Sequence, residues 1–189
     1  QPDVEVHGII AACENMPSGT SYKPGDILTA KNGKTIEVDN TDAEGRLTLA
    51  DALCYASELG VDEIIDIATL TGAVVVALGN FVTGIMGNND ELIAKLIKTA
   101  EESGEKYWQL PMYKEYFNSL KSDIADMKNT GSRMGGASAA GVFLKEFVNV
   151  PKWAHIDIAG TAYLEKPYKE FIAGATGAGV RTLLNYISK

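Results

Sequence analysis

Cysteine and histidine are both scarce in this 189-residue sequence. Its two cysteines, Cys13 and Cys54, cannot form the disulfide framework of a small secreted domain, and neither has a second Cys or a His at zinc-finger spacing. We therefore expect reduced thiols and a cytoplasmic protein. The two histidines, His7 and His155, each lie alone in an apolar stretch, where we expect hydrogen-bonded core side chains and not metal ligands.

Long apolar runs and an excess of basic residues are also absent. The longest apolar run, residues 72–79, is far shorter than the about 20 residues of a membrane-spanning helix. The 17 Lys and Arg residues are outnumbered by 25 Asp and Glu residues, giving a formal net charge of -8, which argues against a general nucleic-acid binder. The chain begins with Gln1 and not Met, and a strand-like run starts at Val4, so we expect a segment cut from a larger protein.

The residues that are present predict an α/β domain. With 46% hydrophobic and 22% charged residues, the chain can form one sizeable core and one domain. Apolar runs of strand length alternate with segments of helical period. This order predicts a three-layer α/β/α domain with a central mixed, largely parallel sheet. The expected elements are strands at 4–12, 63–68, 123–127 and 153–159, a hairpin at 27–30 and 34–38, and helices at 47–59, 91–103, 114–120, 137–148 and 182–187.

The segment NTDAEGR, residues 40–46, is the most informative part of the sequence. Asp42 and Glu44, two residues apart on an extended loop, can project to the same side, where their hard oxygen atoms suit a divalent cation or a pair of cations. Arg46 would then lie beside the metal as a fixed positive charge for an anion. The alternative is a capping box, in which Thr41 and Glu44 bond the first amides of the following helix. Gly45 weakens this alternative, because glycine in a first turn is unfavourable.

Two further features accompany the strands. The polar, glycine-ended turn of residues 69–72 directly follows the buried strand at 63–68, and open α/β sheets bind ligands at such turns. Asp66 and Asp157 each interrupt an apolar strand, and a buried carboxylate must be paired, protonated or bound to metal. We expect both to be structural, accepting hydrogen bonds from backbone amides or hydroxyl groups near the strand ends.

Residues 40–47 are identical to the signature of the leucyl aminopeptidase (cytosol aminopeptidase) family, which the chain resembles over nearly its whole length. The other stretches that resemble this family are residues 13–19, 24–26, 50–53, 68–73, 155–162 and 174–177. The resemblance implies removal of the first residue, leucine by preference, from peptide substrates. It implies that one metal also binds the free α-amino group, which restricts cleavage to that residue.

The resemblance also implies roles for particular residues. Asp42 would be a ligand of one metal of a two-metal centre of manganese or zinc, and Glu44 would contact both metals, which activate a bridging water. Arg46 would hold a bicarbonate-like anion that accepts the proton of that water. The backbone of the turn would align the substrate, through the residues Thr69, Leu70 and Gly72.

The sequence departs from the family pattern upstream of Asp42. The family's catalytic domain has two lysines and two aspartates there. They include metal ligands of both types and a lysine that polarises the scissile carbonyl. No residue before Asp42 matches that pattern. We therefore expect residues 1–189 to be an inactive C-terminal portion of the catalytic domain, truncated at its N-terminal side. The missing segment would leave a sheet edge exposed, which would promote self-association. The resemblance implies that complete family members form hexamers. The alternative is a noncatalytic scaffold or binding module that kept the fold.

Overall fold

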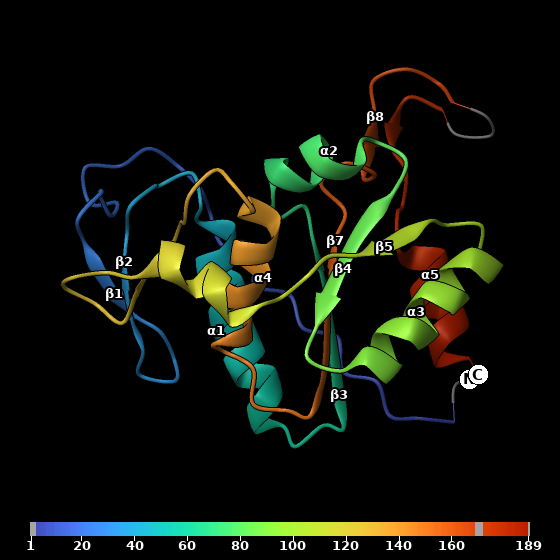
Figure 1. Cartoon of the computed structure of the whole chain (residues 1–189), viewed down its shortest axis with the longest axis horizontal. Coiled ribbons are helices and arrows are strands. Elements are labelled where there is room, and N and C mark those ends of the chain that lie inside the picture. The colour runs from blue at the N-terminus through green and yellow to red at the C-terminus, as the bar shows by residue number, and fades with distance from the viewer. Residues whose placement is uncertain (1–2, 169–171, 189) are drawn as a thin grey trace. The chain divides into compact units, whose positions relative to one another are not determined.

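The computed structural model describes residues 3–168 and 172–188, in which helices and strands alternate along the chain (Figure 1). The chain forms two compact units, each built from segments far apart in the sequence. Unit 1 comprises residues 1–7, 65–111 and 151–189, and unit 2 comprises residues 8–64 and 112–150. Mixed sheets and helices confirm the predicted α/β class.

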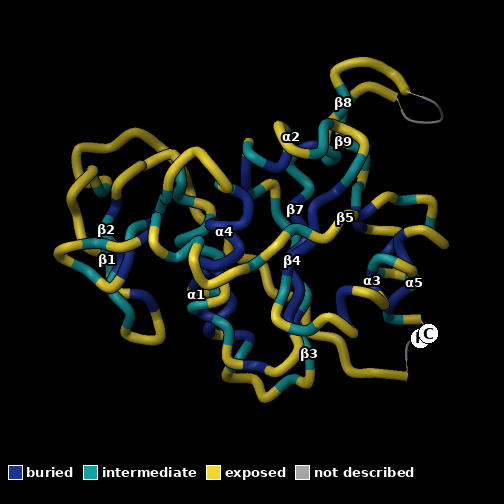
Figure 2. The backbone as a smooth tube through the Cα atoms, viewed as in Figure 1, coloured by how far each residue is buried: buried dark blue, intermediate teal, exposed yellow. Residues whose placement is uncertain are grey.

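The sheet of unit 1 has four strands in the order β3-β7-β4-β5. Strand β4 pairs antiparallel with β7 and parallel with β5, so the sheet is mixed as predicted. The two central strands, β7 and β4, are its most deeply buried part (Figure 2). The strands are β3 (Glu63–Ala68), β4 (Thr83–Gly87), β5 (Tyr107–Gln109) and β7 (Lys152–Asp157).

Helices α3 (Asp90–Glu102) and α5 (Val180–Ile187) form the main core of unit 1 together with the sheet. Asn89 caps α3, because its side-chain oxygen accepts a hydrogen bond from the Leu92 amide at 2.8 Å. The apolar face of α3 packs against β4, β7 and α5. Unit 1 also contains α2 (Gly72–Leu78) and the short antiparallel pair β8 (Tyr163–Leu164) and β9 (Gly174–Ala175).

Unit 2 contains the predicted hairpin and the helices that carry its core. Strands β1 (Ile27–Thr29) and β2 (Thr35–Glu37) are antiparallel, and β6 (Met127–Lys128) continues their sheet parallel to β2. Helix α1 (Gly45–Glu58) packs against α4 (Gly136–Lys145), which also contacts the 3-10 helix η1 (Lys114–Leu120). The large side chains buried in unit 2 include Leu53, Leu120, Phe143 and Phe147.

Several sequence predictions were wrong in detail. Residues 4–12 do not form a strand, and the side chains of Val4, Val6 and Ile10 are exposed. A run of β-branched residues forms a strand only where a neighbouring strand pairs with its backbone, and otherwise its backbone groups bond water. Of the strand expected at 123–127, only Met127 is in a strand, the two-residue β6. Helix α4 ends at Lys145 and not at residue 148. No helix or strand was predicted at the positions of α2, β4 and β5.

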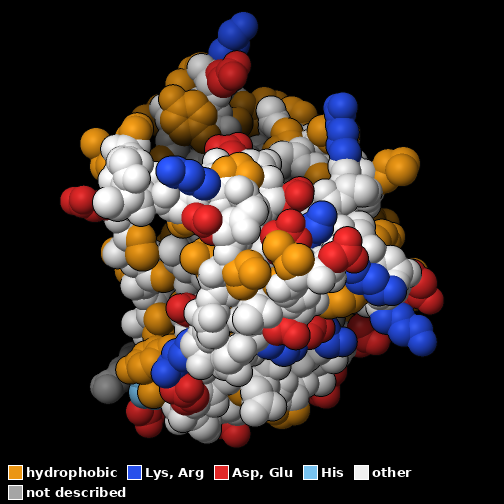
Figure 3. Space-filling model, turned by 90° about the vertical axis from the view of Figure 1, so that its left-hand side faces the viewer, with side chains coloured by type: hydrophobic (Ala, Val, Ile, Leu, Met, Phe, Trp, Pro, Cys, Tyr) orange, Lys and Arg blue, Asp and Glu red, His pale blue; other side chains and the backbone are white. Residues whose placement is uncertain are grey.

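Charges of both signs are mixed on the surface. Lys and Arg side chains are interspersed with Asp and Glu side chains on the face shown in Figure 3. In unit 2, Lys31 lies 3.0 Å from Glu58, and Lys128 lies 3.7 Å from Asp39. In the described part of the chain, no helix combines the length and apolar character needed to cross a membrane.

The close contact between β4 and β7 at Gly87 leads to a stability prediction. A Cβ atom at Gly87 would lie 2.2 Å from the Trp153 carbonyl oxygen and 3.1 Å from the Ala154 Cα. Because the obstacle is backbone, Gly87→Ala should lower the free energy of unfolding by about 1–3 kcal/mol, as overpacking typically does. Chemical denaturation measures the loss.

Gly8→Ala is the control, because a Cβ atom at Gly8 would have nothing within 4 Å and its φ is not positive. Equal unfolding midpoints for the two variants would contradict the register of β4 and β7.

Candidate functional site

The loop before α1 carries the predicted metal ligands. Helix α1 begins at Gly45, and Glu44 occupies its N-cap position without a side-chain hydrogen bond to the helix. The capping-box alternative is therefore wrong. The Glu44 carboxylate instead accepts a hydrogen bond from the Asn15 side-chain amide, with 3.0 Å between Nδ2 and Oε1. A carboxylate that does not cap a helix remains available as a ligand.

Asp42 and Glu44 line the same open cavity of unit 2, which has a volume of about 1060 Å³. The loop is not extended as predicted, because the Glu44 backbone is helical, with φ −74° and ψ −36°. Asp42 is nevertheless exposed and Glu44 half-buried at this one cavity. The structure thus brings the two predicted carboxylates to one place.

The cavity has a negative electrostatic character. Tyr22 also lines it, and the pKa of the Tyr22 hydroxyl is raised by burial and, to a smaller extent, by the negative charge of Glu44. The negative charge of Glu44 therefore disfavours the ionised form of this hydroxyl. A cation bound among these groups would be attracted by Asp42 and Glu44.

The carboxylates fit part of a metal-ligand set. Asp42 and Glu44 supply the hard oxygen donors that divalent cations prefer. Among residues 3–168 and 172–188, however, no group of three or more His, Cys, Asp and Glu side chains could hold a metal ion. Two carboxylates are too few for a two-metal centre, so further ligands would have to complete the site.

Arg46 is held beside this loop by contacts within unit 2 that include a hydrogen bond and a ring contact. Its Nη1 donates a hydrogen bond to the backbone carbonyl of Asn129 at 2.9 Å. Its guanidinium carbon lies 5.9 Å from the centre of the Phe143 ring, within the range of a cation–π interaction. The half-buried guanidinium therefore keeps a fixed position on the first turn of α1.

The predicted substrate-aligning turn lies in unit 1, between β3 and α2. The Asp157 carboxylate accepts hydrogen bonds from the amides of Leu70 at 3.1 Å and Thr71 at 3.4 Å, and from the Thr71 hydroxyl at 2.7 Å. The Thr71 hydroxyl in turn caps α2 by accepting from the Val74 amide at 3.0 Å. Thr69 and Gly72 are exposed at either end of this fixed turn.

The structure therefore places the predicted site residues in two groups. Asp42, Glu44 and Arg46 lie on one loop and helix start in unit 2. The residues of the turn, Thr69, Leu70 and Gly72, lie together in unit 1.

The structure also tests the predictions for the remaining titratable residues of unit 1. Asp157 is structural as expected, with hydroxyl and backbone donors. Asp66 is paired differently from the prediction: its oxygen atoms lie 2.7 Å from the Trp153 indole nitrogen and 2.5 Å from His155 Nδ1. His155 is fully buried as expected. His7 is exposed beside Glu5, so the prediction of a core histidine there was wrong.

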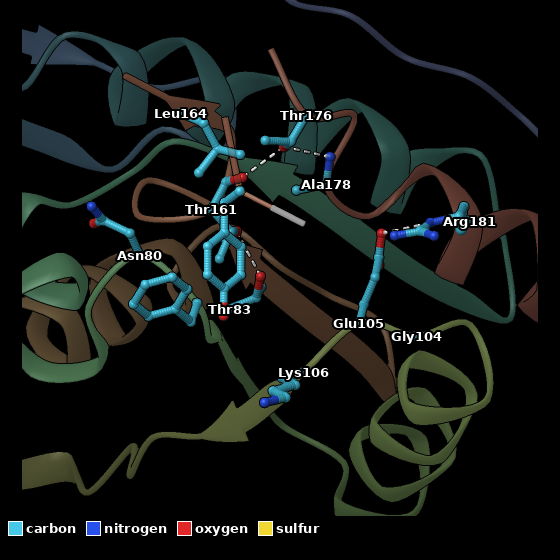
Figure 4. A pocket seen from close by; sticks show the side chains of 12 residues that line it. Asn80, Thr83, Gly104, Glu105, Lys106, Thr161, Leu164, Thr176, Ala178 and Arg181 are labelled. Carbon is cyan, nitrogen blue, oxygen red and sulfur yellow. Dashed lines mark hydrogen bonds and ion pairs between the residues drawn. The ribbon is translucent and has the colours of Figure 1, made fainter. Parts of the chain in front are cut away.

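A second, smaller cavity lies in unit 1, with a volume of about 150 Å³ (Figure 4). Its polar side chains bond one another: the hydroxyls of Thr83 and Thr161 are 2.7 Å apart, and the Thr176 hydroxyl donates to the Thr161 carbonyl at 2.6 Å. Glu105 and Arg181 pair at 3.9 Å along its edge. None of Thr69, Leu70 and Gly72 lines this cavity, so it is not part of the predicted site.

Sequence reasoning missed two asparagines that contact the loop of residues 39–46. Asn15 lies in the stretch 13–19 that resembles the aminopeptidase family, and this resemblance could have drawn attention to it. Asn129 lies just after β6, outside every stretch used for the resemblance, and no periodicity singles it out. Its partners are remote in sequence, so only the three-dimensional structure identifies it.

Comparisons with known proteins agree with this picture. Residues 1–184 match the cytosol aminopeptidase family, catalytic domain. A probable cytosol aminopeptidase of Cyanothece sp. is 58% identical over 187 residues, which cover 99% of this chain and 38% of that protein. A probable cytosol aminopeptidase of Gloeobacter violaceus is 59% identical over 187 residues, covering 99% of this chain and 37% of that protein.

A solved structure agrees as well. A mutant of tomato leucine aminopeptidase superposes with a TM-score of 0.88 at 53% sequence identity, covering 93% of this chain and 34% of that one. The chain thus spans about 38% of the length of the first of these relatives. The family predicted from the sequence is confirmed, and this chain belongs to the cytosol aminopeptidase family.

Proposed function

We propose that residues 1–189 are the C-terminal portion of the catalytic domain of a metal-dependent aminopeptidase, which removes N-terminal residues from peptides. The observation that carries this proposal is the presence of Asp42 and Glu44 at one cavity, on a loop whose sequence is the family signature. The names of the relatives support peptidase activity and a cytoplasmic location.

The chain's own residues would divide the work as follows. Asp42 and Glu44 would hold divalent metal ions, manganese or zinc, together with ligands from outside this chain. Such a metal pair supplies Lewis acidity and an activated water when bound. Arg46, fixed by Asn129 and Phe143, would hold a bicarbonate-like anion beside the carboxylates. A guanidinium presents parallel N–H donors that match a planar oxyanion.

The turn of residues 69–72 would orient the peptide. Asp157 fixes its backbone, so its remaining amide and carbonyl groups would lose little conformational entropy when a substrate binds. The family resemblance favours leucine as the first residue. Other apolar residues should also be accepted, since apolar pockets discriminate a single methylene by only about 1–3 kcal/mol.

The role of Glu44 is tested by Glu44→Gln in the longest natural protein that carries this chain. Glutamine retains the oxygen that accepts from Asn15 but loses the negative charge, so metal binding should fail while folding is preserved. Activity should fall by at least the ~100-fold that loss of even an outer-shell partner can cause. Release of nitroaniline from leucyl nitroanilide measures it.

Glu58→Gln is the matched control, because it makes the same chemical change at an exposed carboxylate of α1 that pairs with Lys31. Activity of Glu44→Gln equal to that of Glu58→Gln would refute the metal-ligand role and favour a noncatalytic scaffold.

Residues 1–189 by themselves should be inactive. The described residues provide no group of three or more metal-binding side chains, so added manganese or zinc should not produce a working centre. The isolated chain is assayed with leucyl nitroanilide at increasing metal concentration. Metal-dependent turnover by this chain would contradict the proposed shortage of ligands.

We also propose that the chain forms homo-oligomers. Val6 and Ile10 have exposed fractions of 54% and 88%, and exposed apolar side chains promote association. The sedimentation coefficient of the chain should therefore rise with concentration, and Ile10→Glu should reduce this rise. A single monomeric boundary at every concentration would count against the proposal.

A further inference from the structure

Asn129 reaches the loop of residues 39–46 because two short strands run in the same direction. Strand β6 pairs parallel with β2, with Met127 opposite Ile36 and Lys128 opposite Glu37. The Asn129 amide then donates to the Glu37 carbonyl at 2.9 Å, which continues the pairing one residue beyond β6. The Asn129 side chain consequently lies beside the backbone that follows β2.

The Asn129 side-chain amide both accepts hydrogen bonds from this backbone and donates hydrogen bonds to it. Its oxygen accepts from the amides of Asp39 at 2.9 Å and Asn40 at 3.2 Å. Its nitrogen donates to the carbonyls of Asn40 at 2.7 Å and Ala43 at 3.4 Å. Asn129 is fully buried, so no water competes for these bonds. These four hydrogen bonds require both the acceptor oxygen and the two N–H donors of a carboxamide side chain.

The same residue also fixes Arg46, whose Nη1 donates to the Asn129 carbonyl. One residue therefore contacts the loop from Asp39, before the first carboxylate, to Arg46, after the second. We infer that Asn129 is a positioning residue, which holds Asp42, Glu44 and Arg46 in the arrangement needed for metal and anion binding. This inference rests on the proposed function of that loop.

The alternative is that Asn129 only stabilises unit 2. The two roles differ in measurable ways. A purely structural residue would lower the unfolding temperature and leave each folded molecule with normal metal binding and turnover. A positioning residue would weaken metal binding and kcat in molecules that are fully folded, because the carboxylates would be displaced from their ligand geometry.

The test uses Asn129→Asp in the longest natural protein that carries this chain. Aspartate keeps the oxygen that accepts from Asp39 and Asn40 but has no donor for the carbonyls of Asn40 and Ala43. Thr130→Val is the matched control: it removes the neighbouring hydroxyl, which donates to Asp39 Oδ2 at 3.0 Å, and leaves the amide bonds of Asn129 intact.

Three quantities are measured below the unfolding temperature: Mn²⁺ affinity by titration calorimetry, kcat, and KM for leucyl nitroanilide. Asn129→Asp should weaken Mn²⁺ binding by about 10- to 100-fold and lower kcat comparably, the range expected when support of a metal ligand is lost. KM should change little, because the turn of residues 69–72 has its own support from Asp157. Thr130→Val should match the unaltered protein in all three.

Normal Mn²⁺ affinity and kcat in folded Asn129→Asp would overturn the inference. Asn129→Ser, with a shorter donor and acceptor, replaces Asn129→Asp if the latter does not fold. Failure of both to fold, while Thr130→Val folds, would also overturn it, because Asn129 would then support the whole fold. Glu44→Gln separates this failure from that of the proposed function: if Glu44→Gln binds Mn²⁺ normally, the site assignment itself is wrong.

Discussion

The buried amide of Asn129 is the interaction on which the arrangement of Asp42, Glu44 and Arg46 depends. Between β2 and α1 the chain has little regular structure of its own, and Asn129 bonds its backbone at Asp39, Asn40 and Ala43. A buried polar group left without its partners costs about 1–3 kcal/mol, so the loop and the amide constrain each other. A cavity lined by carboxylates can thus keep a defined geometry before any cation binds.

In unit 1 a loop is likewise held by a buried side chain, in this case the carboxylate of Asp157. Asp157, at the end of β7, fixes the turn after β3 through the amides of Leu70 and Thr71. In both units a loop that follows a strand is held by a buried polar residue that arrives from a strand end far away in sequence. The side chains of the loop and the backbone groups that the buried residue does not bond therefore remain available for ligands. The buried residue holds the loop in place.

Local patterns explain how much of this could be predicted from sequence. The hairpin of β1 and β2 and the location of Asp42 and Glu44 at one cavity depend on short-range chemistry, and both agree with what the sequence predicts. The segment 4–12 was predicted as a strand from its side chains, but strand formation also needs a pairing partner. The capping box failed because Glu44 bonds Asn15, and Asn129 was missed because its partners lie some 90 residues away. Sequence periodicity contains neither fact.

The central claim is that Asp42 and Glu44 bind the catalytic metal. The most direct measurement is anomalous X-ray diffraction from zinc-loaded crystals of the longest natural protein that carries this chain. The account predicts anomalous peaks with carboxylate oxygens of Asp42 and Glu44 at about 2.0–2.2 Å, the usual zinc–oxygen distance. Zinc peaks coordinated by other residues, with both carboxylates outside bonding distance, would contradict it.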